Sequence, residues 1–379
     1  MSRTAVHDDY DATVGLWPRG TVAQLAYGLC KITVDLASGR RVQAEPLRHD
    51  VWDPRTVARL APGSDHWFDK PATDVFVVGD AIAPHAVPEL AVGVRVGTRE
   101  LGLRVIGRRV ATRRDDRIAF SEPEPFERMP LSWAHAYGGC DPRVDVSVGP
   151  AAHAALGAGT YARNPEGKGY VVLPIERELE LPNLEAPEQP LTPANLVVGD
   201  PRRWFAQPLP RCFAPVPAIA FPRSLWFGLD AWHRAPDDAR LPEVALGMLP
   251  AGFRNTTLPP ARARQEAAPG LVFDALAPGT PIVVAGMDPQ GRSIALTVPP
   301  APTLALELEG QVQRPSPRLT TVALRPNEGR ATFTWAITTT ELPRGFVVGV
   351  HRAIPLALQV DGGTKVAWRP TSDQGAPSP

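Results

Sequence analysis

The sequence predicts a mainly β protein in which two β-rich, sandwich-like blocks of short antiparallel strands are joined by a segment rich in proline, glycine and tryptophan, with few short helices. Its 379 residues include 44 prolines, more than double the usual ~5%, and 32 glycines. Proline spread along the chain prevents long helices and favours short strands joined by loops of fixed geometry. Apolar residues also alternate at period two toward both ends of the chain. With 44% hydrophobic residues and nine tryptophans, the composition is that of a folded protein.

Strand patterns dominate residues 1–120, which we expect to form the N-terminal β-rich block. The run DVFVVGDA at 74–81 is short, apolar and ended by a glycine, as expected for a buried strand. At 90–107, LAVGVRVGTRELGLRVIG alternates apolar and polar residues on both sides of a polar turn. This pattern predicts a hairpin with one buried face. A weak helical pattern at 53–61 is the exception in this block.

Residues 251–370 are predicted to form a second, C-terminal β-rich block. GRSIALTVPP, TLALELEGQVQ and TTVALRPNEGRATFTWAI each alternate at period two. The last of these contains RPNEGR, which we interpret as the loop of a hairpin. The polar tail that follows, 371–379, is expected to fray.

A segment rich in proline, glycine and aromatic residues, 121–250, separates the two blocks. It contains few periodic runs, and its one helical pattern, at 235–249, is interrupted by Pro242. A structureless segment of this length is uncommon in a compact protein, so we expect it to pack on the β blocks. One continuous unit over 20–345 is the alternative to this division.

The charge balance limits the classes of partner. Lys and Arg together number 40, as do Asp and Glu, so the formal net charge is zero. Because domains that bind nucleic acid or anionic membranes are usually basic, we expect no nucleic-acid partner and no membrane insertion. The N-terminus lacks the pattern of a signal peptide, and the three cysteines are too few and too far apart for a disulfide framework. These features predict a cytoplasmic, reduced protein.

The stretch RNPEGKGY at 163–170 resembles a phosphate-binding loop at first sight. A P-loop requires a glycine where this chain has Ala162 and a hydroxyl residue where it has Gly169, so the pattern fails at both ends. Asn-Pro favours a turn, and Gly167 and Gly169 tolerate positive φ. We therefore expect a shaped turn followed by a strand that begins at Tyr170, and no nucleotide or other cofactor.

Local motifs for catalysis or metal binding do not occur in the sequence. It has no His-x-x-x-His, Cys-x-x-Cys or Gly-x-Ser-x-Gly spacing, so we expect no metal site and no hydrolase elbow. In ERELELPNLE, at 176–185, the alternating Glu176, Glu178 and Glu180 favour a solvated strand face over a metal site. The best nucleophile candidate is Cys140, five residues after His135. A small cysteine in a glycine turn explains it equally well, so we expect no catalytic residue and no enzyme, with a Cys140/His135 enzyme as the alternative.

An aromatic, proline-rich stretch at 202–232 is the strongest candidate for a partner surface. Trp, Phe and Arg on loops fixed by proline are typical of protein interfaces, although the same residues can also complete a core. The sequence leaves both readings open. The candidate partner-binding residues are Trp204, Phe205, Phe213, Phe221, Arg223, Trp226, Phe227 and Trp232.

Five motifs occur in one order along the chain: KPATDVFVVGDAIAP (70–84), FERMPLSWAHAYGG (126–139), RNPEGKGY (163–170), LPNLEAPEQPLTPA (181–194) and TTVALRPNEGRATFTWA (320–336). Together they resemble the domain of unknown function 2169 family, which is found in bacterial type VI secretion gene clusters. The resemblance loosens at 200–250, and AHA replaces residues that usually carry charge between Trp133 and Tyr137. The matching positions that shape the backbone are Tyr137, Gly138, Gly139, Asn164, Pro165, Gly167, Gly169, Pro182, Asn183 and Glu185.

The resemblance implies a non-enzymatic adaptor or chaperone. Such a protein would bind an effector (toxin) protein and help to load it onto the type VI secretion spike protein, without a cofactor. The family offers no assigned catalytic residues to transfer to this chain. A structural component of the secretion apparatus is the other alternative.

Overall fold

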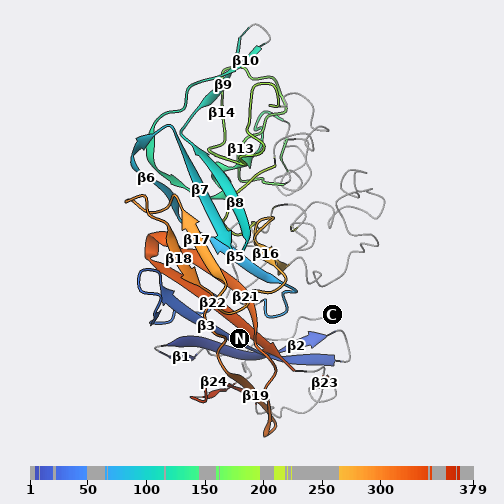
Figure 1. Ribbon diagram of the computed structural model, residues 1–379. Coiled ribbons are helices and arrows are strands. Elements are labelled where there is room, and N and C mark those ends of the chain that lie inside the picture. The colour runs from blue at the N-terminus through green and yellow to red at the C-terminus, as the bar shows by residue number, and fades with distance from the viewer. Residues whose placement is uncertain are drawn as a thin grey trace, which may run out of the picture.

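The computed structural model describes residues 5–7, 9–19, 23–48, 65, 67–114, 117–144, 159–161, 163–196, 209–217, 220, 223, 264–339, 342–343, 356–363 and 365–367. These residues form a mainly β structure of several antiparallel sheets, which confirms the predicted fold class (Figure 1). Within the described residues, two short 3₁₀ helices are assigned, η2 (Trp133–His135) and η6 (Pro326–Glu328). The helical patterns at 53–61 and 235–249 lie outside the described residues.

The largest sheet has nine strands: β1 (Ala5–His7), β2 (Tyr10–Arg19), β3 (Ala23–Asp35), β4 (Arg41–Val42), β5 (Thr73–Val77), β16 (Val272–Phe273), β21 (Arg318–Arg325), β22 (Arg330–Thr338) and β23 (Leu342–Pro343). The order is β1-β2-β3-β22-β21-β5-β16, with β4 and β23 also paired to β3. β5 and β21 are parallel, and the other pairs are antiparallel. Strands from both predicted β-rich blocks thus meet in one sheet, while the boundaries near residues 120 and 250 stay predictions.

In the view of Figure 1, further sheets lie above and below the large one. A five-stranded sheet, in the order β15-β8-β7-β17-β18, contains β7 (Glu89–Val96), β8 (Arg99–Ile106), β15 (Leu184–Glu185), β17 (Pro281–Ala285) and β18 (Ile294–Thr297). A four-stranded sheet contains β19 (Leu304–Leu308), β20 (Gln311–Gln313), β24 (Leu356–Val360) and β25 (Lys365–Ala367). A three-stranded sheet, at the top of Figure 1, has the order β10-β9-β14 and contains β9 (Val110–Arg114), β10 (Arg117–Phe120) and β14 (Glu178–Glu180). The two remaining pairs are β6 (Asp80–Val87) with β11 (Phe126–Pro130), and β12 (Tyr137–Gly138) with β13 (Lys168–Gly169).

The hairpins predicted from alternating residues are confirmed. β7 and β8 pair so that Val92 lies opposite Leu103, and both side chains are buried. β21 and β22 form the late hairpin, and Gly329 adopts φ 66° where the η6 turn enters β22. The prediction of a strand that begins at Tyr170 is wrong, because strand β13 ends at Gly169. The Tyr170 amide still donates to the Gly138 carbonyl of β12 at 2.9 Å, and the chain leaves β12 after this residue.

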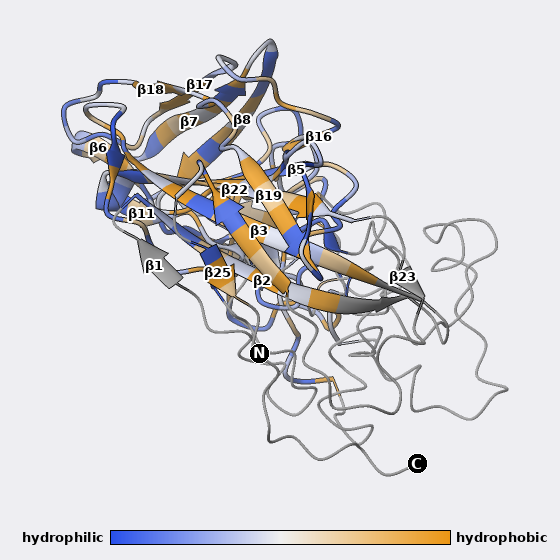
Figure 2. Cartoon of the chain, turned by 90° about the horizontal axis from the view of Figure 1, so that it is seen from below, coloured by the Kyte–Doolittle hydropathy of each residue, from blue (hydrophilic) through white to orange (hydrophobic). Residues whose placement is uncertain are grey.

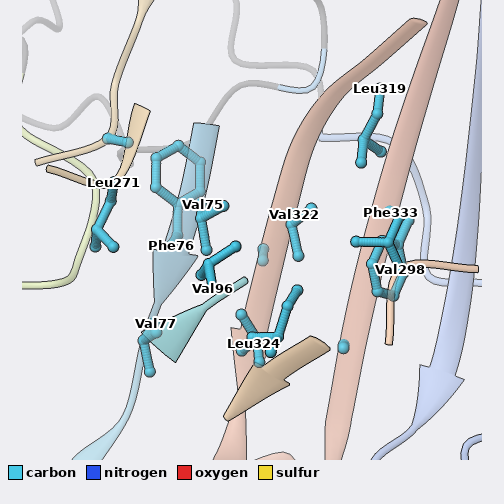
Figure 3. Packing of buried hydrophobic residues seen from close by; sticks show 14 of the residues in the cluster. Val75, Phe76, Val77, Val96, Leu271, Val298, Leu319, Val322, Leu324 and Phe333 are labelled. Carbon is cyan, nitrogen blue, oxygen red and sulfur yellow. The ribbon is translucent and has the colours of Figure 1, made fainter. Parts of the chain in front are cut away.

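The main hydrophobic core lies against one face of the large sheet. Val75 of β5, Val322 of β21 and Phe333 of β22 lie side by side in register and are fully buried (Figure 3). On β3 the same face is so close to the four-stranded sheet that a Cβ on Gly28 would lie 2.7 Å from a methyl of Leu358. Hydrophobic and hydrophilic bands follow one another along the strands, as the period of two requires (Figure 2).

A row of buried polar side chains crosses five strands on the opposite face of this sheet. Asp74 of β5 lies beside Thr321 of β21, Thr321 opposite Thr334 of β22, Thr334 opposite Lys31 of β3, and Lys31 opposite Asp11 of β2. Paired residues share one face, and each of these five is at most 5% exposed. The alternation of apolar and polar residues therefore does not mark an exposed face here.

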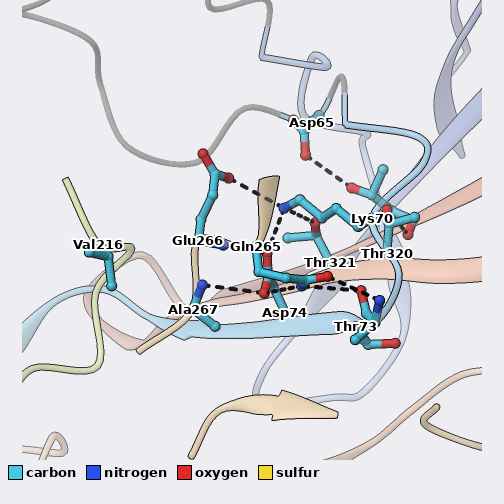
Figure 4. A network of polar contacts seen from close by, with 12 residues as sticks. Asp65, Lys70, Thr73, Asp74, Val216, Gln265, Glu266, Ala267, Thr320 and Thr321 are labelled. Carbon is cyan, nitrogen blue, oxygen red and sulfur yellow. Dashed lines mark hydrogen bonds and ion pairs between the residues drawn. The ribbon is translucent and has the colours of Figure 1, made fainter. Parts of the chain in front are cut away.

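Lys70 covers one end of this polar row. Its Nζ lies 2.7 Å from the Asp74 carboxylate and 3.3 Å from the Glu266 carboxylate, and it donates a hydrogen bond of 3.2 Å to Thr321 Oγ1 (Figure 4). Burial acts to lower the pKa of Lys70, but attraction by the two carboxylates outweighs burial and leaves the pKa raised. The ammonium group is therefore retained in the interior because its partners are charged.

Asp65 covers the row farther along, at Thr334 and Lys31. It accepts hydrogen bonds from Lys31 Nζ at 2.8 Å, from Thr334 Oγ1 at 3.0 Å and from the Arg48 amide at 2.8 Å. Lys70 and Asp65 thus each meet an opposite charge together with further hydrogen-bond partners, as burial requires.

The described ranges contain no helix long and apolar enough to cross a membrane. Within the same ranges, no three His, Cys, Asp or Glu side chains gather as a potential metal site.

Candidate functional site

Three of the five sequence motifs meet at one place between the five-stranded and three-stranded sheets. The short strands β12 and β13 pair in parallel, with Tyr137 beside Lys168 and Gly138 beside Gly169. A parallel bridge between Ala136 and Leu184 adds the third motif. We call this region, residues 133–141, 163–173 and 181–185, the motif junction.

Asn164 holds the first two motifs of the junction together. It is fully buried, and its Nδ2 donates to the carbonyl oxygens of Trp133 at 2.8 Å and Tyr137 at 3.1 Å. Its own carbonyl accepts the Gly139 amide at 2.9 Å. An amide side chain with two donors fits this place, because it bonds one carbonyl of η2, which also accepts the Ala136 amide, and one carbonyl of β12.

The paired glycines allow the two motifs to approach. Gly138 has φ 151°, and a Cβ there would overlap the carbonyl oxygen of Asn164. Gly139 has φ 100°, and its Cβ would overlap the carbonyl oxygen of Gly167. Glycine is therefore required by close backbone contact as well as by the positive φ.

Asn183 joins the junction to the five-stranded sheet. Its amide donates to the His135 carbonyl at 2.8 Å, and its Nδ2 donates to the Ile106 carbonyl at 2.8 Å. The Ile106 amide returns a hydrogen bond of 2.8 Å to the Asn183 carbonyl. The side chain thus extends the β8 ladder by one residue into the turn.

Glu185 is a buried acceptor on the next turn of chain. It forms an ion pair with Arg109, lies 3.3 Å from Arg104, and accepts the Leu191 amide at 3.1 Å. Burial raises the pKa of Glu185, and the two arginines offset this only in part. The carboxylate therefore depends on Arg109 to remain charged, which ties β15 to the segment before β9.

Asp141 and Arg143, which follow the motif at 126–139, bind the segment after β13 through hydrogen bonds. Asp141 accepts the amides of Val172 at 3.0 Å and Leu173 at 2.9 Å, and Arg143 donates to the carbonyls of Leu173 at 3.0 Å and Pro174 at 2.7 Å. These bonds explain why the chain after Tyr170 does not form the predicted strand: the amides of Val172 and Leu173 are taken by a side chain, whereas the Tyr170 amide donates to the Gly138 carbonyl. Burial acts to raise the pKa of Asp141, but hydrogen bonds from Arg143, Leu173 and Val172 outweigh it and lower the pKa to about 2.

A groove of about 290 Å³ lies between this fastened turn and strand β14. The turn at 140–143 lines one side, and residues 176–179 line the other. The side chains between them are mainly apolar, namely Tyr170, Val171, Ile175 and Leu179. Both sides are held by hydrogen bonds, the turn through Asp141 and the strand through its ladder with β9, so the groove exists before anything binds to it.

The profile of one protein family matches residues 22–336 of the chain: "Uncharacterized protein conserved in bacteria (DUF2169)". The chain belongs to the DUF2169 family. No curated protein and no solved structure matches it. The match spans all five sequence motifs, so the motif junction is built from segments that the family profile covers.

The Cys140/His135 alternative for this DUF2169 protein stays a prediction. Cys140 is exposed on the rim of the groove and forms a backbone bridge with Thr160. His135 is half-buried, which lowers the pKa of its imidazole, and Lys168 lowers it further. Its Nδ1 lies 2.8 Å from Ser132 Oγ, and no hydrogen bond between His135 and Cys140 occurs among the described residues.

The aromatic candidates divide into two sets. Phe213 is fully buried in the main core, and its carbonyl accepts the Val77 amide at 3.0 Å. Arg223 is also buried and forms an ion pair of 3.1 Å with Glu266. Neither side chain presents an exposed surface. The other six lie outside the described residues: Trp204, Phe205, Phe221, Trp226, Phe227 and Trp232.

Sequence reasoning identified the residues that shape the junction and missed the residues that form the groove. Asp141 and Arg143 pair with each other, but their other partners are backbone groups of a segment about 30 residues away, which no local spacing reveals. One available signal was the Asp-Pro-Arg sequence directly after Gly-Gly-Cys. An aspartate in such a turn commonly accepts backbone amides.

Proposed function

We propose that this DUF2169 protein is a non-enzymatic adaptor that binds an effector (toxin) protein in the cytoplasm and helps to load it onto the type VI secretion spike. The observation that carries the proposal is the preformed groove beside the motif junction. A groove with fixed walls, apolar side chains between them and charged residues on both sides binds a protein segment at low cost in conformational entropy. The link to type VI secretion rests on the five ordered motifs and is itself part of the proposal.

The mechanism that we propose is stoichiometric binding. The adaptor holds its partner through side-chain and backbone contacts and changes no covalent bond. Loops fixed by proline keep the binding surface in one conformation, which reduces the ordering cost on association. We expect no cofactor, no metal and no nucleic acid in the complex.

The test is affinity purification of the tagged chain from its own host, with mass spectrometry of the proteins that accompany it. We expect a near-stoichiometric toxin-like or spike protein when the secretion system is expressed. A clean protein without a partner under those conditions would contradict the adaptor proposal. Cys140→Ala is the matched variant for the enzyme alternative, and it should retain the same partner.

The aromatic stretch is tested in the same experiment. Removal of 200–235 would also remove Phe213 and Arg223 from the core, so a deletion cannot separate binding from folding. Alanine substitutions at Trp204, Trp226 and Trp232 are the better test. Partner recovery equal to that of the unchanged protein would remove these three residues from the binding surface.

A further inference from the structure

Strand β14 forms the outer edge of the three-stranded sheet, beside the groove. Its residues pair with β9 so that Leu179 lies opposite Ala111. The Leu181 amide donates to the Arg109 carbonyl at 3.1 Å, so the odd-numbered residues direct their backbone groups toward β9. Since direction alternates along a strand, the N–H and C=O of Glu178 point away from β9.

This outer edge has unused hydrogen-bonding capacity. Across the described residues, no backbone or side-chain group bonds to the N–H or C=O of Glu178. Unpaired edge groups of this kind are a template for another strand, and edge strands are usually protected by charge or by a covering segment. Here the exposed Glu178 side chain supplies charge, and the groove leaves space beside the strand.

The surroundings of the edge match one kind of occupant. Leu179 faces the apolar side of the groove with Val171 and Ile175. A residue paired with Glu178 would lie on the same side of the sheet as its carboxylate, where Lys or Arg is favoured. An extended segment that alternates apolar and polar residues therefore fits this edge: its apolar side chains face the groove, and a basic side chain faces the Glu178 carboxylate.

We infer that an extended segment of a partner protein adds to β14 as a fourth strand of this sheet. The segment forms main-chain hydrogen bonds with Glu178, places an apolar side chain in the groove lined by Val171, Ile175 and Leu179, and places a basic side chain opposite Glu178. Binding of this kind takes affinity from the backbone and specificity from alternate side chains. This inference rests on the proposed adaptor function, since it names how the bound protein is held.

The test uses nine-residue synthetic peptides in which Val, Ile or Leu alternates with Thr around a central Lys. Fluorescence anisotropy measures binding to the full chain, and hydrogen exchange measures protection of the Glu178 amide. Glu178→Pro removes the outward N–H without touching the β9 ladder, and Glu178→Ala removes only the charge. We expect the alanine variant to bind within about fivefold of the unchanged protein, as for an exposed ion pair. The proline variant should lose at least about tenfold, since a main-chain bond is lost and the ring obstructs the edge.

A second perturbation covers the case in which the proline variant fails to fold. Cys140 lies on the opposite rim of the groove and is exposed. Modification with a bulky maleimide should abolish peptide binding, whereas the small methylthio group should weaken it much less. Equal binding by the bulky adduct, equal binding by a folded proline variant, or no binding of any peptide at millimolar concentration would overturn the inference.

The result is distinguishable from the fate of the adaptor proposal. If the native partner accompanies the proline variant as well as the unchanged protein, the edge inference fails while the adaptor function stands. If the peptides bind at β14 but no protein accompanies the chain in its host, the adaptor function fails while the edge inference stands.

Discussion

Replacement of Lys70 by methionine tests whether the buried polar row stabilises the large sheet through charge. Lys70 is fully buried, and its Nζ lies 2.7 Å from Asp74 and 3.3 Å from Glu266. Methionine has a similar length and fills the same space without the charge. The variant leaves Asp74 in the interior without its cation, and loss of one partner of a buried pair costs about 3–5 kcal/mol.

Part of this cost is offset by contacts that remain. Asp74 also accepts Gln265 Nε2 at 2.6 Å and the Glu266 amide at 2.9 Å, and Glu266 keeps its ion pair with Arg223. We therefore expect a loss near the lower end of that range, about 3 kcal/mol. The double variant Lys70→Met/Asp74→Asn should lose less than the sum of the single variants by about 1 kcal/mol or more, because it removes the unpaired charge.

The assay is urea unfolding monitored by tryptophan fluorescence. The dependence of the free energy of unfolding on urea concentration must have the same slope for each variant. The matched control is Lys168→Met, since Lys168 lies 2.7 Å from Glu180 but both side chains are partly exposed, at 22% and 48%. An ion pair of this kind contributes at most about 1 kcal/mol. If the two methionine variants lose the same stability, burial of the charge is not what makes the Lys70 contacts important, and the reasoning is refuted.

Three further predictions concern the motif junction. Gly138→Ala should lower the free energy of unfolding by more than about 3 kcal/mol, because the added Cβ overlaps the backbone. Gly310 has φ 80° and nothing near its Cβ, so Gly310→Ala should lower it by about 1 kcal/mol. Equal urea midpoints for the two variants would contradict this prediction. Asp141 has its pKa lowered from 3.8 to about 2, so its stabilisation, about 2 kcal/mol, is present above pH 4 and lost as the pH falls toward 2. Asp141→Asn should remove that part of the acid dependence in unfolding measured from pH 5 to 2. In the native protein the exposed Cys140 should react with a disulfide reagent well before the two buried cysteines. Burial raises the pKa of one of these, Cys212, to about 12. Simultaneous reaction of all three would show that the core opens.

The sequence by itself determined the elements whose information is local. The hairpins at 90–107 and 320–337 follow from period-two alternation on both sides of a turn, because side-chain direction and turn geometry depend only on neighbouring residues. The Asn-Pro turn at 164–165 was predicted for the same reason, whereas Gly138 and Gly139 were marked as backbone-shaping positions by the resemblance to the family. Where an amide finds a distant acceptor, as at Val172, the local strand pattern failed.

Only the tertiary structure decided which remote strands are neighbours and which polar residues are interior. β3 pairs with β22 across about 300 residues, and no local pattern carries the register of such a pair. That register places Asp74, Thr321, Thr334 and Lys31 in one buried row, and it is the meeting of opposite charges from distant segments that makes the burial favourable. The groove beside β14 has the same origin, since its two sides, residues 140–143 and 176–179, are separated in the sequence and meet only in the folded structure.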